Sequence, residues 1–175
     1  MNRAIRFAPL VILFAIVAAL VWRLATPADT SVHSTMVGKA VPNFPPVAAT
    51  TERADFGSSD LARGQPHLVN FFASWCVPCI SEAGVLGDLK SRGVPIYGIA
   101  VRDRPEELAE FLDRNGDPYQ LIASDPQSDI QIEFGSSGVP ESFIVDGRGI
   151  IKYQHIGPIE PADEPVILAK FEQSR

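Results

Sequence analysis

The chain has 175 residues, a formal net charge of −6, and a composition that is 46% hydrophobic and 21% charged. This length and composition suffice for one ordinary hydrophobic core, so we expect one globular domain. The acidic balance, together with the lack of a Lys and Arg stripe interleaved with aromatic residues, argues against nucleic acid as a partner.

The N-terminal segment has the features of a membrane anchor. Arg3 and Arg6 precede an uncharged apolar stretch, 7–22, of about sixteen residues, which would be ~24 Å long as a helix. Positive charge before such a stretch keeps that end in the cytoplasm, so we expect the rest of the chain to be exported. A cleaved signal peptide is the alternative, although Thr26 to Ala28 offers a poor cleavage site.

Residues 26–39 are polar and show no sustained apolar period, which is typical of a tether. We therefore divide the chain into a cytoplasmic stub with a membrane anchor (1–25), a tether (26–39) and a globular domain (40–175). Whether the anchor is retained or cleaved, both cysteines of the chain would lie outside the cytoplasm.

Two apolar segments flank the only two cysteines, Cys76 and Cys79. His67–Phe72 is typical of a short buried strand, and Ile80–Lys90 carries apolar residues at roughly helical intervals. Cys76 therefore falls at the start of a helix, where unpaired backbone N–H groups and the helix dipole stabilise a thiolate and lower the pKa of that cysteine. Cys79, one turn inside the helix, is placed to attack a mixed disulfide formed at Cys76.

This spacing indicates a redox-active dithiol, against two structural alternatives. A zinc site needs about four ligands, but the sequence has no second cysteine pair and its three histidines (His33, His67 and His155) are scattered, so we expect no metal. A purely structural disulfide would close a very short loop and contribute little stabilisation. We expect no cofactor apart from the dithiol itself.

The rest of the chain alternates between strand-like and helix-like segments. The predicted elements are a strand at Pro95–Val101, an amphipathic helix at Pro105–Arg114 ended by 115–118, two strands at Ser142–Val145 and Ile150–Ile156 joined by the turn Asp146–Gly149, and a helix at Pro165–Phe171. Leu108, Phe111 and Leu112 form the inner face of the first of these helices. The order predicts an α/β fold, a mixed central sheet flanked by helices.

Three motifs make the chain resemble a known family over about residues 38 to 172. Val69–Cys79, Gly135–Phe143, and Asp146–Ile151 followed by Gly157–Ile159 are similar to the membrane-anchored thiol:disulfide interchange proteins of cytochrome c biogenesis, the DsbE or CcmG type. The resemblance implies a thioredoxin-like fold and a periplasmic reductant held on the bacterial inner membrane by a single span. Its substrates would be apocytochrome c or haem-ligation proteins, and a membrane thiol reductase would supply its electrons.

The resemblance also implies roles for individual residues. Cys76 would be the attacking thiol and Cys79 the resolving thiol of the redox-active disulfide. Pro140 would be a cis-proline that faces this disulfide, and the backbone of Val139 would pair with a substrate strand. We expect Trp75 to shield the disulfide, with contact to substrate as a secondary role.

Glu82 and Glu141 match acidic residues of the same family. A buried Glu82 beside Cys79 could accept the proton of that thiol, provided that desolvation raises the pKa of Glu82 toward neutrality. The alternatives are a first-turn acid in water for Glu82 and a solvated loop residue for Glu141. Asn70 replaces the buried aspartate of ordinary thioredoxins, so any proton acceptor for Cys79 must come from elsewhere.

The substrate stays open at this point. An anchored reductant for copper-site assembly or for general periplasmic thiols shares the cysteine motif, and a non-catalytic module that holds apocytochrome is a third possibility. Ser136 and Ser137 stand where the family usually has larger residues, which would alter the groove where a partner docks. We expect His155 to be a structural histidine in its strand.

Overall fold

The computed structural model describes residues 12–18, 34–50 and 53–175. The chain divides after His33 into two units, which are treated separately. In the first unit, residues 12–18 are helical and exposed. No helix within the three described ranges is both long and apolar enough to span a membrane. Most of the predicted anchor at 7–22, and the whole of 19–33, lie outside those ranges.

The second unit is built on a five-stranded mixed sheet with the strand order β3-β2-β1-β4-β5. The strands β1, β2 and β3 are parallel, and β4 and β5 are antiparallel to their neighbours. The strands are β1 (His67–Phe72), β2 (Ile96–Val101), β3 (Leu121–Asp125), β4 (Glu141–Val145) and β5 (Ile151–Ile156). The predicted mixed sheet is therefore confirmed, with β3 as an unpredicted strand.

Five helical segments surround this sheet. They are η1 (Ser58–Ala62), α2 (Val77–Ser91), α3 (Pro105–Asn115), α4 (Asp129–Glu133) and α5 (Glu164–Glu172). The three predicted helices correspond to α2, α3 and α5, and the predicted inner face of α3 is buried. Sequence analysis missed η1 and α4, because five residues are too few to show a helical period.

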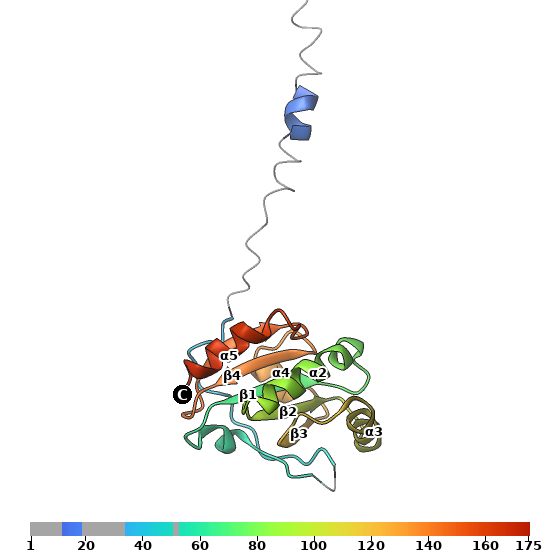
Figure 1. Ribbon diagram of the computed structural model, residues 1–175, viewed down its shortest axis with the longest axis vertical. Helices are drawn as coiled ribbons and strands as arrows, with labels where there is room; N and C mark the ends of the chain where they lie inside the picture. The colour runs from blue at the N-terminus through green and yellow to red at the C-terminus, as the bar shows by residue number, and fades with distance from the viewer. Residues whose placement is uncertain (1–11, 19–33, 51–52) are drawn as a thin grey trace, which may run out of the picture. The chain divides into compact units, whose positions relative to one another are not determined.

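The sheet separates two hydrophobic clusters. One cluster contains residues of α2, α3 and α5, and the other contains residues of η1, α4 and the segment before β1; α2 and α5 lie across the near side of the sheet in Figure 1. Successive strand residues point to opposite faces, so Leu68 and Phe72 join the first cluster, whereas Val69 and Phe71 join the second. Asn70 shares the face of Leu68 and Phe72 and therefore points toward α2.

The segment before β1 is hydrogen bonded to residues of both outer strands of the sheet. At the β5 edge, the Gly38 N–H donates to the Ile151 carbonyl at 2.8 Å, and the Ile151 N–H donates to the Lys39 carbonyl at 2.9 Å. At the β3 edge, the Ser124 N–H donates to the Val47 carbonyl at 2.8 Å. The last residues of the predicted tether are thus hydrogen bonded to the sheet.

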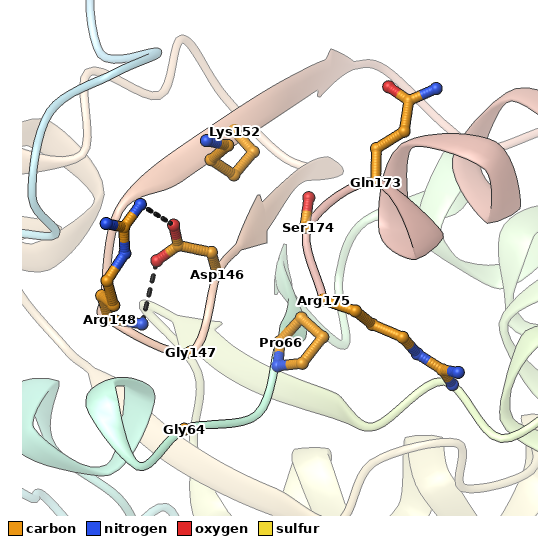
Figure 2. A pocket seen from close by; sticks show the side chains of 9 residues that line it. All are labelled: Gly64, Pro66, Asp146, Gly147, Arg148, Lys152, Gln173, Ser174 and Arg175. Carbon is orange, nitrogen blue, oxygen red and sulfur yellow. Dashed lines mark hydrogen bonds and ion pairs between the residues drawn. The ribbon is translucent and has the colours of Figure 1, made fainter.

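The turn between β4 and β5 is fixed by the buried carboxylate of Asp146 (Figure 2). It accepts hydrogen bonds from the backbone N–H groups of Arg148 and Ile150 at 2.9 and 3.0 Å, and one from the Arg148 guanidinium at 3.3 Å. Burial alone would raise the pKa of Asp146, but these hydrogen bonds hold that pKa below its ordinary value. Gly147 is required next to it, because a Cβ there would lie 2.4 Å from the backbone carbon of Gly64. The predicted hairpin is confirmed.

Candidate active site

The two cysteines form a disulfide at the start of α2. Their Cα atoms are 5.3 Å apart. Cys76 is the N-cap residue of the helix, and its Sγ accepts a hydrogen bond from the Cys79 N–H at 3.2 Å. Pro78 fits the first turn, where a missing N–H leaves no partner unsatisfied. The helix start predicted at Cys76 is confirmed, and the disulfide is largely shielded, since the cysteines are 4% and 2% exposed.

The turn that leads from β1 into the disulfide is held by the connection between β2 and α3. The carboxylate of Asp103 accepts hydrogen bonds from the backbone N–H and the hydroxyl of Ser74, each at 2.6 Å. The indole N–H of Trp75 donates to the Arg102 carbonyl at 3.3 Å. Arg102 has a φ of 49°, a left-handed conformation that is uncommon for a residue other than glycine. Sequence analysis did not identify Asp103 or Arg102.

An exposed apolar surface surrounds the disulfide. Trp75, Val77 and Ile80 are 56%, 75% and 45% exposed. A cavity of about 330 Å³ lies between Trp75, Ile80 and residues of α3, among them Phe111. Contiguous exposed apolar side chains mark surfaces that bind other proteins, so this region is available to a substrate.

Glu82 is buried one turn beyond Cys79. Its side chain is 1% exposed; one carboxylate oxygen accepts from the Asn70 amide at 3.0 Å and the other accepts from the Ile159 N–H at 3.0 Å. Burial raises the pKa of Glu82 to about 7, although these two hydrogen bonds act in the opposite direction. The alternative of a first-turn acid in water is wrong, because Glu82 lies in the second turn and away from solvent.

Glu141 is buried at the start of β4, so the alternative of a solvated loop residue is also wrong. Its carboxylate accepts from the Ser137 N–H at 2.7 Å, from the Ser136 hydroxyl at 2.9 Å and from the Ser137 hydroxyl at 3.1 Å. The Gln154 amide of β5 donates to its other oxygen. Glu141 therefore holds the bend at 135–138 against the end of the sheet.

Val139 and Pro140 follow this bend. The peptide bond between them is cis, as the resemblance implied. Val139 is half-buried and packs against the hydrophobic cluster that contains both cysteines. Pro140 is buried, and its carbonyl accepts from the Gly157 N–H at 3.1 Å.

Several residues of the site could not be found from local sequence. Tyr119, Ser142 and the Ile159 backbone all belong to the hydrogen-bond network of Asn70 and Glu82, at sequence separations of 49, 72 and 77. No short motif joins positions so far apart. His155 bonds the Pro158 carbonyl at 3.2 Å, which agrees with its predicted structural role.

The cavity drawn in Figure 2 lies apart from this site. It has a volume of about 370 Å³ and is lined by the β4–β5 turn, Lys152 and the last residues after α5. Because Val145 pairs with His67 at the start of β1, this turn lies at the opposite end of that strand from the disulfide. We therefore assign it no part in dithiol chemistry.

The geometry defines a class of protein. A central strand runs into a Cys-x-x-Cys disulfide at a helix start, apolar side chains surround it, and a buried carboxylate with a pKa of about 7 lies one turn further along the helix. A dithiol placed in this way exchanges electron pairs with other disulfides. This is the site of a thiol-disulfide oxidoreductase.

Comparisons with known proteins agree with this class. The Redoxin family profile matches residues 36–170. The chain is 34% identical to the thiol:disulfide interchange protein DsbE of Escherichia coli K12, over 92% of this chain and 89% of that one. It is 34% identical to the thiol:disulfide interchange protein HelX of Rhodobacter capsulatus, over 98% and 96%. A crystal structure of a thiol:disulfide interchange protein of the thioredoxin family from Chlorobium tepidum superposes with a TM-score of 0.57 at 26% identity, covering 77% of this chain and 94% of that one.

The chain belongs to the redoxin family, among the DsbE-type thiol:disulfide interchange proteins. The thioredoxin-like fold and the disulfide oxidoreductase activity that the sequence resemblance implied are thereby confirmed.

Proposed function

We propose that this chain is a periplasmic reductant, anchored in the bacterial inner membrane, that reduces disulfides of apocytochrome c or of haem-ligation proteins during cytochrome c maturation. The supporting observation is its similarity to DsbE and HelX over 92% and 98% of the chain, together with the buried acid Glu82 one turn beyond Cys79. A membrane thiol reductase supplies the electrons, and the chemistry needs no cofactor besides the dithiol.

The reaction is a two-step exchange. The Cys76 thiolate attacks one sulfur of the substrate disulfide; that S–S bond breaks, and the leaving substrate thiolate takes a proton from solvent. The Cys79 thiol gives its proton to the Glu82 carboxylate, and the Cys79 thiolate then attacks Cys76. The second substrate thiolate leaves and is protonated. The substrate has gained two electrons and two protons, and the protein is left with the Cys76–Cys79 disulfide seen in the structure.

Glu82 is suited to this proton transfer for two reasons. It lies three residues after Cys79 in the same helix, and residues at that spacing are neighbours on one helix side. A base with a pKa near the working pH accepts a proton readily and also releases it readily, and the pKa of Glu82 is about 7.

The substrate strand is held by the bend that Glu141 fixes. In this proposal the backbone of Val139 pairs with an extended segment of the substrate, while Pro140 keeps that edge beside the disulfide. The exposed side chains of Trp75, Val77 and Ile80 contact the substrate from the other side. Glu141 does not touch the substrate and acts through the loop.

Trapping in cells tests the substrate assignment. A Cys79→Ser variant cannot resolve its mixed disulfide, so the substrate should stay bound to Cys76 and be identified by mass spectrometry after non-reducing purification. A Cys76→Ser variant, which lacks the attacking thiol, is the matched control. Recovery of apocytochrome c or haem-ligation proteins supports the proposal. Recovery of copper-site assembly proteins, or of many unrelated periplasmic proteins, would replace it.

The membrane location has its own test. N-terminal sequencing of the mature protein from the membrane fraction should find residues 1–25 retained. A mature chain that begins near Asp29 and stays in the soluble fraction would show cleavage and overturn the anchor.

A further inference from the structure

The ring of Tyr119 lies across one face of the sheet, against β2. Tyr119 is two residues before the start of β3, yet its ring stacks on Phe72 of β1, with centroids 4.4 Å apart and planes 21° apart. It passes over Gly98 of β2, which pairs with Asn70 on one side and with Ile122 on the other. A Cβ at Gly98 would lie 2.9 Å from the Tyr119 ring and 2.7 Å from the Phe72 ring. The absence of a side chain at Gly98 therefore leaves the space that the Tyr119 ring occupies.

In this position the Tyr119 hydroxyl lies next to the side chain of Asn70. The hydroxyl donates to the Asn70 side-chain carbonyl at 2.8 Å. The Asn70 amide nitrogen then donates to Glu82 and to the Ser142 hydroxyl, each at 3.0 Å. All of these groups are buried, so no solvent molecule competes for them. Each polar atom of the Asn70 side chain thus has a fixed partner.

We propose that Tyr119 is a positioning residue for Glu82: its hydroxyl fixes the Asn70 amide with the nitrogen toward the Glu82 carboxylate. Because Asn70 is not ionisable, it cannot share the proton that Glu82 receives. Tyr119 and Asn70 therefore set how readily Glu82 binds a proton, without touching the cysteines. The inference deepens the proposed function, since that function makes Glu82 the proton acceptor for Cys79.

The orientation of the amide matters because an ionised carboxylate can only accept hydrogen bonds, whereas a protonated carboxyl can donate one. An amide nitrogen toward Glu82 favours the ionised form, and an amide oxygen toward Glu82 favours the protonated form. The Tyr119 hydroxyl, by donating to the amide oxygen, holds that oxygen away from Glu82. Loss of the hydroxyl frees the amide to turn.

The titratable groups near Glu82 in the described part of the chain are few. On α2 itself there is Cys79, which does not titrate while the disulfide is intact. Tyr119 is the titratable group from the connection before β3, and its pKa is raised first by burial and then by the charge of Glu82. On β5, His155 pairs across the sheet with Ser142 and bonds the Pro158 carbonyl. From β4 and the segment after β5, Ser142 and the Ile159 backbone contribute only neutral groups.

The test measures the protonation of Glu82 in the oxidised full-length protein. Infrared spectroscopy follows the C=O stretch of the protonated carboxyl as pH is varied, and a Glu82→Gln variant identifies the band by its loss. In Tyr119→Phe the pH at which this band has lost half of its intensity should rise by about half to one pH unit. Tyr97→Phe is the matched control, because it removes a tyrosine hydroxyl from β2 that has no bond to this network.

Gly98→Ala gives an independent second variant that removes no polar group. The added methyl would displace the Tyr119 ring, so the Glu82 midpoint should move up as it does in Tyr119→Phe. If this variant does not fold, Tyr119→Phe alone decides. An unchanged or lowered midpoint in folded Tyr119→Phe would overturn the proposal, whatever its effect on stability.

The outcome is separable from that of the proposed function. The carboxyl band is measured on the disulfide form, without turnover, so it reports the network even if Glu82 plays no part in exchange. A raised pH midpoint in Tyr119→Phe, combined with normal exchange in Glu82→Gln, would support the positioning role of Tyr119. The same result would contradict the role of Glu82 as the proton acceptor for Cys79. If the pH dependence of exchange in Tyr119→Phe moves by the same amount as the pH midpoint of the carboxyl band, both proposals are supported.

Discussion

The two buried acids of this site differ in their hydrogen-bond partners, although their identity and burial are the same. Glu82 and Glu141 are both glutamates with at most 1% exposure, yet they have different surroundings. Glu82 accepts two hydrogen bonds, and its pKa is raised to about 7. Glu141 accepts four hydrogen bonds, three of them from Ser136 and Ser137. The first is suited to exchange a proton, and the second to hold a loop.

The two cysteines should differ in reactivity. In the reduced protein at neutral pH, iodoacetamide should alkylate Cys76 at least about tenfold faster than Cys79, because Cys76 is at the helix start, where backbone N–H groups stabilise a thiolate. Mass spectrometry of peptides after timed quenching measures both rates. Faster labelling of Cys79 would reverse the assignment of the attacking and resolving thiols.

Replacing Glu82 should slow the resolving step. We expect Glu82→Gln to decrease the rate at which a Cys76 mixed disulfide is released by about 10²-fold, since a general base contributes at least this much. In the wild type this rate should rise with pH as Glu82 ionises around pH 7, and in the variant that rise should be absent. Stopped-flow measurement of thiol release follows the step.

The control for this experiment is Asp88→Asn, which removes an exposed acid from the same helix. Its rates should match the wild type at every pH. If Glu82→Gln resolves as fast as wild type, Cys79 loses its proton elsewhere.

Among the elements, the bend at 135–138 and the start of β4 form one hydrogen-bonded unit. The Ser136 hydroxyl lies 2.9 Å from both the Gly138 carbonyl and the Glu141 carboxylate, and its one hydrogen is shared between these two acceptors. The small side chains at 136 and 137, where relatives were expected to have larger ones, allow both hydroxyls to reach the buried carboxylate. These two serines therefore connect the bend to the start of β4.

Removing that carboxylate should loosen the bend. We expect Glu141→Ala to decrease the free energy of unfolding by about 2–4 kcal/mol, because the donors from Ser136, Ser137 and Gln154 lose their buried acceptor. Exchange with a protein disulfide should slow by at least about tenfold, while reaction with a small aromatic disulfide should change little. Urea unfolding and parallel kinetic assays measure these effects. Glu133→Ala, an exposed acid on α4, should leave both unchanged.

The predicted strands had either a short apolar core, as in β1, β2 and β4, or a turn signal beside them, as in β5. In β1 and β4 every residue is buried, including the polar residues Asn70, Glu141 and Ser142. β3 was missed because only Leu121 and Ile122 are large and apolar. Pairing with β2 stabilises it, as do hydrogen bonds to the carbonyls of Val47 and Ala54. The cysteine pair and the cis-proline followed from local motifs. The burial of Glu82 did not, because it depends on Ile159, 77 positions away.

The burial of Glu82 makes the stability of the whole molecule depend on pH. Its pKa is raised from 4.5 to about 7, so the folded protein binds more protons than the unfolded chain between these pH values. For such a group the stabilising contribution is fully present below pH ~4.5 and is lost as pH rises through ~7. The acid that we propose as the proton acceptor for Cys79 thus lowers the stability of the folded protein near neutral pH.

The stability of the oxidised protein should show this effect. Relative to Glu82→Gln, the wild type should lose about 3 kcal/mol of unfolding free energy between pH ~4.5 and ~7.5, the linkage expected for this pKa difference. Urea unfolding of both proteins at a series of pH values gives the difference directly. Parallel curves for the two proteins would contradict the raised pKa.

The segment before β1 has a consequence for self-association. An open sheet presents unpaired N–H and C=O groups at its outer strands, and these groups are templates for pairing with a second molecule. Here residues 38–41 pair with residues 149–151, where β5 begins, and residues 47–48 pair with Ala123 and Ser124 of β3. Phe44, between them, is anchored against Phe56 and Phe134. The same short length of chain that precedes the first strand therefore pairs with part of each outer strand and leaves a shorter edge for pairing with a second molecule.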